Sequence, residues 1–146
     1  WGKLTAEQLV DKFWKAVTSG TYATHGETFQ DPNEIIWWAK GGKLKGESAA
    51  RIEFLKNIVE ESGLYGLEPL DSWWILNGVG KNGDYYLYYF GDEELDEWKF
   101  ELPGFKKDAE IQIGTKFKVD IIDTWNMTVT PAPDIYEVTD KRSGKH

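Results

Sequence analysis

The spacing of hydrophobic residues changes between residues 62 and 67, and this change limits the possible folds more than any other feature. Before it, hydrophobic residues recur at helical spacing over residues 5–19 and again over residues 48–62. After it, short alternating runs are separated by turn residues. The chain therefore predicts an α+β fold, with an N-terminal helix–strand–helix unit over residues 1–66 and an antiparallel β-sandwich over residues 67–146.

The first helix is expected over Thr5–Ser19. Thr5 is a good N-cap, and Gln8 completes a capping box with it. Gly20 is expected to end the helix, because glycine readily adopts the left-handed conformation that follows a last turn. One face carries the hydrophobic residues Leu9, Val10, Phe13, Trp14 and Val17.

The second helix is expected over Ser48–Ser62, with Ser48 as its N-cap and Gly63 at its end. Tyr22–His25, between the two helices, is predicted to be a short strand. A lone strand leaves its backbone groups unpaired, so two helices and one strand cannot close a sheet. We therefore interpret residues 1–62 as the end of an α/β barrel or as a unit docked on the sandwich.

The helices carry more apolar surface than one strand can cover. We expect this surface to be buried against the sandwich, against a second copy, or against other segments of a longer chain. The chain begins with Trp1, and its single methionine is Met127. We expect from this that it was excised from a longer polypeptide.

Several short strands are expected after residue 67. A turn is expected over Asn77–Gly83, and Pro131 and Pro133 are expected to end the last long run. Ile135–Val138 is expected to begin a final strand. The expected strands are Trp73–Leu76, Asp84–Phe90, Glu97–Leu102, Lys116–Asp123 and, after a bulge or bend, Asp123–Val129.

Composition excludes several classes of partner. The formal net charge of −8 and the pI near 4.8 disfavour nucleic acid, whose phosphates would be repelled. The sequence has no apolar run long enough for a membrane span and no secretory signal pattern. It has no cysteine, and no spacing in it predicts a metal site or a cofactor. These features favour a cytoplasmic location, although the compartment of a longer parent stays open.

The residues between Tyr22 and Gly46 favour a sugar-binding site. His25 and Glu27 offer polar groups for hydroxyls, and Lys40 lies in the glycine-rich loop that follows. Trp37 and Trp38 offer indole faces that stack on the apolar side of a pyranose ring.

A structural interpretation of these residues stays open. The tryptophans would then be core, and His25 and Glu27 would be a hydrogen-bonded pair. Trp37 and Trp38 are adjacent, so on a strand at most one of them would face a sugar. The other tryptophans are expected in the sandwich core or at an interface: Trp73, Trp74, Trp98 and Trp125.

Four stretches resemble the C-terminal part of bacterial cellulase-like glycoside hydrolases. Two of them match the last unit of a (β/α)8 barrel, and two match the small β-sandwich of unassigned role that follows it. The resemblance covers nearly the whole chain. The stretches lie at residues 13–28, 37–55, 85–91 and 119–128.

The resemblance implies that Tyr22–His25 is the eighth barrel strand and that Glu27–Gly46 is the loop over the active-site face. It also implies a retaining mechanism with two catalytic glutamates, both before Trp1. We therefore assign no catalytic residue to this chain and expect it to be inactive alone. Its expected partners are carbohydrate and either the remainder of the parent barrel or a second copy of the chain.

The chain is thus interpreted as the C-terminal portion of a retaining cellulase-like glycoside hydrolase, supplying part of the sugar-binding cleft and an accessory β-sandwich. Two alternatives from other classes stay open. One is a non-catalytic carbohydrate-binding module, and the other is a purely structural accessory domain. The residues assigned to sugar contact are His25, Glu27, Trp37, Trp38 and Lys40.

Overall fold

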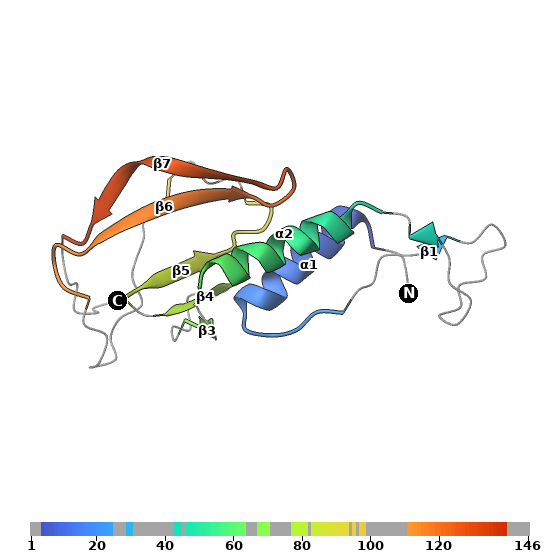
Figure 1. Cartoon of the computed structure of the whole chain (residues 1–146), viewed down its shortest axis with the longest axis horizontal. Helices are drawn as coiled ribbons and strands as arrows, with labels where there is room; N and C mark the ends of the chain where they lie inside the picture. The colour runs from blue at the N-terminus through green and yellow to red at the C-terminus, as the bar shows by residue number, and fades with distance from the viewer. Residues whose placement is uncertain are drawn as a thin grey trace.

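The structure is a mixed α+β fold with two helices and antiparallel sheets, as the sequence predicts (Figure 1). The computed structural model describes residues 4–24, 29–30, 43–44, 46–63, 67–70, 77–81, 83–93, 95, 97–98 and 111–139. The elements are α1 (Ala6–Thr18), β1 (Phe29–Gln30), β2 (Lys43–Leu44), α2 (Ser48–Glu61), β3 (Glu68–Pro69), β4 (Gly78–Lys81), β5 (Tyr85–Tyr88), β6 (Lys116–Asp123) and β7 (Thr128–Glu137).

Helix α1 begins with the capping box that the sequence predicts. The Gln8 backbone N–H donates to Thr5 Oγ1 at 3.2 Å, and the Thr5 backbone N–H donates to Gln8 Oε1 at 3.1 Å. At the other end, Gly20 has a positive φ of 70°, and its N–H donates to the carbonyl of Val17. Both ends of this helix are therefore set by residues within a few positions of them.

Helix α2 ends as expected but begins differently. Gly63 follows it with a φ of 65°. The prediction that Ser48 is the N-cap is wrong, because Glu47 holds that position and makes no side-chain cap bond. Ser48 is the first helical residue and is fully buried, where a small side chain allows close packing. Neither described helix is long and apolar enough to cross a membrane.

The two helices lie side by side and run in the same direction (Figure 1). The chain must therefore return along the molecule between them. The prediction of a strand over Tyr22–His25 is wrong for its described part, since residues 21–24 form no strand and Tyr22 is fully exposed. His25 lies outside the described residues. A strand needs a neighbour for its backbone groups, and none of the described segments pairs with residues 21–24.

A short antiparallel pair, which the sequence analysis missed, lies between the helices in sequence. In it Phe29 is paired with Leu44 and Gln30 with Lys43. Figure 1 shows β1 beyond the N-terminal ends of α1 and α2. The pair joins the two ends of the interval 31–42, which lies outside the described residues.

Strands β3, β4 and β5 form an antiparallel sheet in that order. The prediction of a turn over Asn77–Gly83 is wrong for Gly78–Lys81, because these four residues form strand β4. The sheet needs glycine there, since a Cβ on Gly80 would collide with the backbone carbonyl oxygen of Tyr85. The expected strand Trp73–Leu76 lies outside the described residues.

The hairpin of β6 and β7 forms a second antiparallel sheet (Figure 1). The bounds predicted for Lys116–Asp123 are confirmed. The prediction that Asp123–Val129 continues that strand is wrong, because residues 124–127 turn the chain back. Met127 has a φ of 56° in this turn.

Strand β7 also runs through Pro131 and Pro133, which were expected to end the preceding run. None of the described strands pairs with the other edge of β7. Proline is tolerated on such an edge, because a missing N–H on the outer side breaks no ladder bond. The residues expected to begin a final strand, Ile135–Val138, mostly continue β7.

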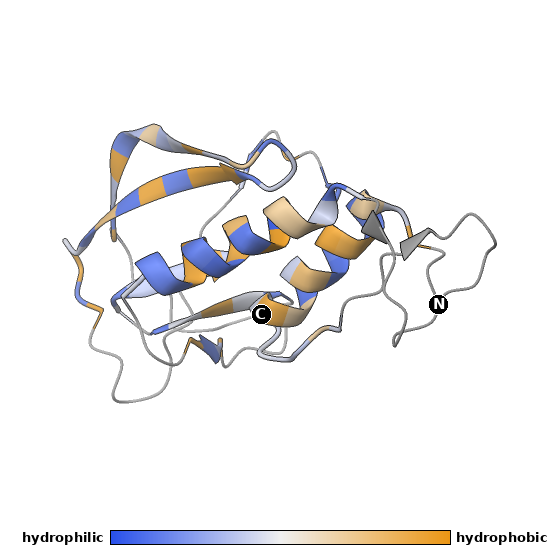
Figure 2. Ribbon diagram, turned by 45° about the vertical axis from the view of Figure 1, so that its right-hand side comes forward, coloured by the Kyte–Doolittle hydropathy of each residue, from blue (hydrophilic) through white to orange (hydrophobic). Residues whose placement is uncertain are grey.

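One hydrophobic core joins the helices to the sheet. The apolar faces of both helices are buried against β4, β5 and the residue that follows β5, and Figure 2 shows hydrophobic residues gathered on part of each helix surface. The helix faces are thus covered within this chain, by the sheet of the part expected to form the sandwich; the sandwich itself stays a prediction. The predicted boundary after residue 66 stays a prediction. The buried members of the core are Val10, Trp14, Leu55, Val79, Leu87 and Tyr89.

We predict that Gly80→Ala lowers the free energy of unfolding by about 3 kcal/mol or more, because the Tyr85 carbonyl cannot move without separating β4 from β5. Chemical denaturation would measure this. Gly63→Ala is the matched control, since Gly63 has a positive φ but open space around it, and it should cost about 1 kcal/mol. Equal losses in the two variants would contradict the close approach at Gly80.

Candidate functional site

None of the five predicted sugar-contact residues lies in the described part of the chain. His25 falls in the interval 25–28 with Glu27, and Trp37, Trp38 and Lys40 fall in the interval 31–42. Strand β1 directly follows the first interval, and β1 and β2 border the second. Their assignment to a sugar site therefore stays a prediction.

The described residues carry a different candidate, an aromatic surface made of Tyr88, Phe90 and Trp98. The ring of Trp98 lies 5.0 Å from that of Tyr88 and 5.0 Å from that of Phe90, measured between centroids. The interplanar angles are 62° and 70°, so both contacts are edge-to-face. Strand β5 and the residues directly after it thus fix the position of the indole.

This surface is partly open to solvent. Phe90 is 39% exposed and Trp98 is 44% exposed, whereas Leu87, on β5, is buried. Leu87 and Phe90 are an odd number of residues apart, so in extended chain they point to opposite sides, in agreement with this difference in burial. Burial raises the pKa of the Tyr88 phenol, so Tyr88 stays neutral at physiological pH.

The expectation for Trp98 is wrong in part. Trp98 is expected on a strand over residues 97–102, and either in the sandwich core or at an interface; only the strand at 97–98 and the core position are contradicted. Residues 97 and 98 form no strand, and the indole is substantially exposed. The signal that was available is its sequence context, because Glu97 and Lys99 place a charge on each side of it. Such a context favours a surface position.

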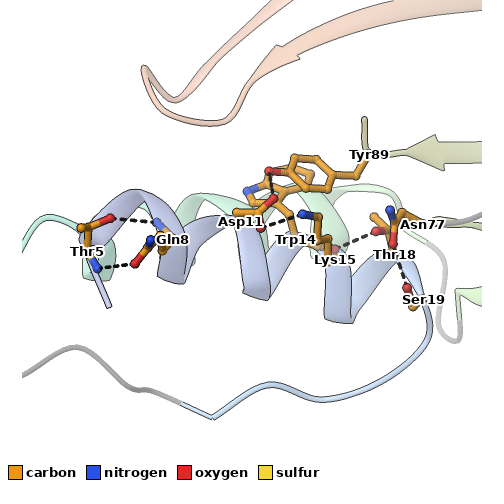
Figure 3. A network of polar contacts seen from close by, with 9 residues as sticks. All are labelled: Thr5, Gln8, Asp11, Trp14, Lys15, Thr18, Ser19, Asn77 and Tyr89. Carbon is orange, nitrogen blue, oxygen red and sulfur yellow. Dashed lines mark hydrogen bonds and ion pairs between the residues drawn. The ribbon is translucent and has the colours of Figure 1, made fainter. Parts of the chain in front are cut away.

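A second described arrangement connects α1 to the end of β5 (Figure 3). The Tyr89 hydroxyl donates to Asp11 Oδ1 at 3.0 Å, and Lys15 Nζ donates to Asp11 Oδ2 at 2.8 Å. The Trp14 ring stacks on the Tyr89 ring with centroids 5.6 Å apart. One carboxylate thus connects the helix to the aromatic residue that it packs against.

The electrostatics of this junction fit a structural role. Burial and the carboxylate of Asp11 raise the pKa of the Tyr89 phenol, so it remains a hydrogen-bond donor at neutral pH. The hydrogen bond to Asp11 raises the pKa of Lys15, which remains charged. The indole N–H of Trp14 is buried and has no acceptor among the described residues. Packing therefore holds Trp14 in place.

A third contact connects α2 to the β6–β7 hairpin. The guanidinium of Arg51 lies 3.6 Å from the ring centroid of Trp125, and Arg51 Nε donates to the Trp125 carbonyl at 2.8 Å. The same side chain donates to the Glu47 carbonyl at 2.7 Å. A planar cation with several donors can make all three contacts at once.

The turn that presents Trp125 is held by Asp123. Its carboxylate accepts hydrogen bonds from the backbone N–H groups of Trp125 at 3.0 Å and of Asn126 at 2.8 Å, and from the Asn126 side chain. The bonds from Asn126, and then the one from Trp125, hold the pKa of Asp123 below its ordinary value. In the described ranges, no three His, Asp or Glu side chains lie together in a group that could hold a metal ion.

The described elements define an α+β protein in which helices and antiparallel sheets share a core. Residues 70–142, half of the chain, match the family model described as Domain of unknown function (DUF5605), so the chain belongs to this family. No curated protein matches the chain.

The chain is also similar to a solved structure, described as a putative glycoside hydrolase from Bacteroides vulgatus ATCC 8482. The sequence identity is 41% and the TM-score is 0.80. The match covers 94% of this chain but only 27% of that chain. The similarity thus relates this chain to one part of a glycoside hydrolase-type polypeptide.

We predict that Arg51→Lys lowers the free energy of unfolding by about 1–2 kcal/mol, because an ammonium cannot keep both the stacking on Trp125 and the bond to its carbonyl. Lys56→Ala on the same helix is the control. Its ion pair with Glu60 is exposed on both sides and contributes about 0.5 kcal/mol or less. An unchanged free energy of unfolding in Arg51→Lys would mean that the contact contributes little to stability. Thermal or chemical denaturation gives the comparison.

We predict that Asp123 makes stability depend on acid pH. Because its pKa is lowered by folding, its contribution is complete above the ordinary aspartate pKa and is lost as pH falls through the lowered value. Asp123→Ala should therefore be less stable than the parent sequence at pH 7, and the difference should shrink as the pH falls. Denaturation curves across this range would test it, with Asp134→Ala, on β7, as control. A difference independent of pH would count against the ionised carboxylate.

Proposed function

We propose that this chain is the C-terminal portion of a retaining cellulase-like glycoside hydrolase, in which it supplies part of the sugar-binding cleft and an accessory β-sandwich. The observation that carries the proposal is the similarity to the putative glycoside hydrolase of Bacteroides vulgatus. It extends over 94% of this chain at 41% identity, and it occupies 27% of the other chain. A share of that size leaves room for most of a barrel elsewhere in the parent polypeptide.

The direction of the helices supports the barrel part of the proposal. In a (β/α)8 barrel, consecutive helices run in the same direction and the chain returns between them through a strand. Helices α1 and α2 have this relation (Figure 1). Residues 21–24 occupy the position in sequence where the strand belongs, and in the parent they would gain the neighbouring strand that they need.

The location of β1 and β2 supports the cleft part. Active sites of these barrels lie at the end where the strands finish and the following helices begin. Figure 1 shows β1 beyond the N-terminal ends of both helices. The intervals bordered by this pair contain His25, Glu27, Trp37, Trp38 and Lys40. In the proposal these residues contact the sugar, by hydrogen bonds to hydroxyls and by stacking on a ring.

The catalytic carboxylates are expected in the parent, outside this chain. A retaining mechanism needs two carboxyl groups about 5 Å apart, one as acid/base and one as nucleophile. The resemblance implies that both are glutamates on earlier barrel strands. The chain would then supply binding and positioning, while the bond cleavage takes place on residues of the preceding segment.

The proposal predicts that the isolated chain hydrolyses no aryl β-glycoside, whereas the parent polypeptide does. Release of nitrophenol from a panel of nitrophenyl glycosides would measure both. Replacing the parent's two expected glutamates by glutamine one at a time should abolish the release. Glu27→Gln in the parent should weaken substrate binding without abolishing the reaction.

Two outcomes would contradict the proposal. Turnover by the isolated chain that is lost in Glu27→Gln would make Glu27 catalytic. A parent without any turnover, but with a chain that binds glycans, would favour the alternative of a non-catalytic carbohydrate-binding module. The exposed rings of Phe90 and Trp98 are the observation in favour of that alternative. A parent with neither property would leave a structural accessory domain.

A further inference from the structure

We propose that the aromatic surface of Tyr88, Phe90 and Trp98 is a second sugar-contact site, separate in sequence from the cleft residues, and that it binds the apolar face of a pyranose ring in a glycan chain. The inference rests on the proposed function for the class of ligand. Its structural basis is the pair of edge-to-face contacts that hold a substantially exposed indole at the end of β5.

The geometry makes this surface suitable for stacking. Trp98 has rings packed against it at two points, each at 5.0 Å between centroids. A side chain held in this way loses little conformational freedom when a ligand binds. Phe90 is itself packed against Trp98, so each of the two exposed rings helps to hold the other in place. A sugar therefore meets a preformed platform.

The surroundings provide the polar half of a sugar site. Glu97 directly precedes Trp98, and Asp92 and Glu93 come two and three residues after Phe90; all three residues are exposed. Carboxylates accept hydrogen bonds from sugar hydroxyls. The same charges, within a chain of net charge −8, repel phosphate and other polyanions. A neutral glycan can both stack on the rings and donate hydrogen bonds to the carboxylates, so it is the ligand that fits this surface.

The exposed apolar residues of the hairpin offer a contrast. Ile121 and Ile135 are more exposed than Phe90 or Trp98, but their side chains are aliphatic and cannot stack on a sugar. Tyr136 is the exposed aromatic residue of β7, with 48% of its surface open. None of the described ring contacts involves it. Tyr136 is therefore a matched control of similar exposure outside the platform.

The test titrates the 146-residue chain with cellohexaose, xylohexaose and mannohexaose. The indole N–H resonance of Trp98, assigned by its loss in Trp98→Phe, should shift and saturate with at least one of the three. In calorimetry, Trp98→Ala should weaken binding of that hexaose by about ten-fold. Phe90→Ala should weaken it in the same direction, and Tyr136→Ala should leave it unchanged.

Folding is controlled in the same experiment. Loss of Trp98 removes contacts to Tyr88 and Phe90, so thermal unfolding of each variant is compared with the parent sequence. Trp98→Phe keeps an aromatic ring and is the conservative variant, for which binding should fall less than for Trp98→Ala. A Trp98 resonance that none of the three hexaoses shifts would overturn the proposal, as would equal affinities of Trp98→Ala and Tyr136→Ala.

The two proposals can fail separately. Hydrolysis of nitrophenyl glycosides by the parent polypeptide decides the proposed function and does not depend on Trp98. Hexaose binding that responds to Trp98 decides the second site. A parent that hydrolyses aryl glycosides, with a Trp98 that responds to no hexaose, would retain the first proposal and reject the second.

Discussion

The packing of Trp14 on Tyr89 is the contact on which the rest of the structure depends. It brings α1 against the end of β5, and the buried residues of α2 and β4 belong to the same cluster. The hydrogen bond from the Tyr89 hydroxyl to Asp11 fixes the orientation of the Tyr89 ring against α1. Burying side chains of this size stabilises a fold by about 1.5–3 kcal/mol each. Together with Val10, Leu55, Val79 and Leu87, this pair covers the apolar faces of the helices and of the sheet.

The same junction determines where the aromatic surface lies. Tyr88, Tyr89 and Phe90 are consecutive, and only Tyr89 faces the core that it shares with Trp14. Because neighbouring residues in extended chain point to opposite sides, the anchored Tyr89 directs its neighbours away from α1. The contact that joins the helices to the sheet thus also presents Tyr88 and Phe90 to Trp98.

Two different sugar-contact regions are proposed on this chain, and they have different support. The first, around His25 and Trp37, comes from residue chemistry and from a resemblance, and it lies outside the described residues. The second, around Trp98, comes from described ring contacts and exposure. A glycosidase with one contact at the cleft and another on an accessory sheet would hold a glycan chain at two points. Binding at the second point raises the effective concentration of the glycan at the catalytic residues.

The sequence by itself determined the elements whose signals are local. Thr5 and Gln8 cap a helix through bonds between nearby residues, and the strand Lys116–Asp123 has its own alternating pattern. The tertiary structure decided what depends on distant partners. Gly80 lies in a strand because β4 pairs with β5, and Trp98 lies at the surface because it packs on Tyr88 and Phe90, the neighbours of the core residue Tyr89. Tyr22 lies outside any strand because a strand exists only when a neighbour pairs with it, and a sequence pattern does not supply that neighbour.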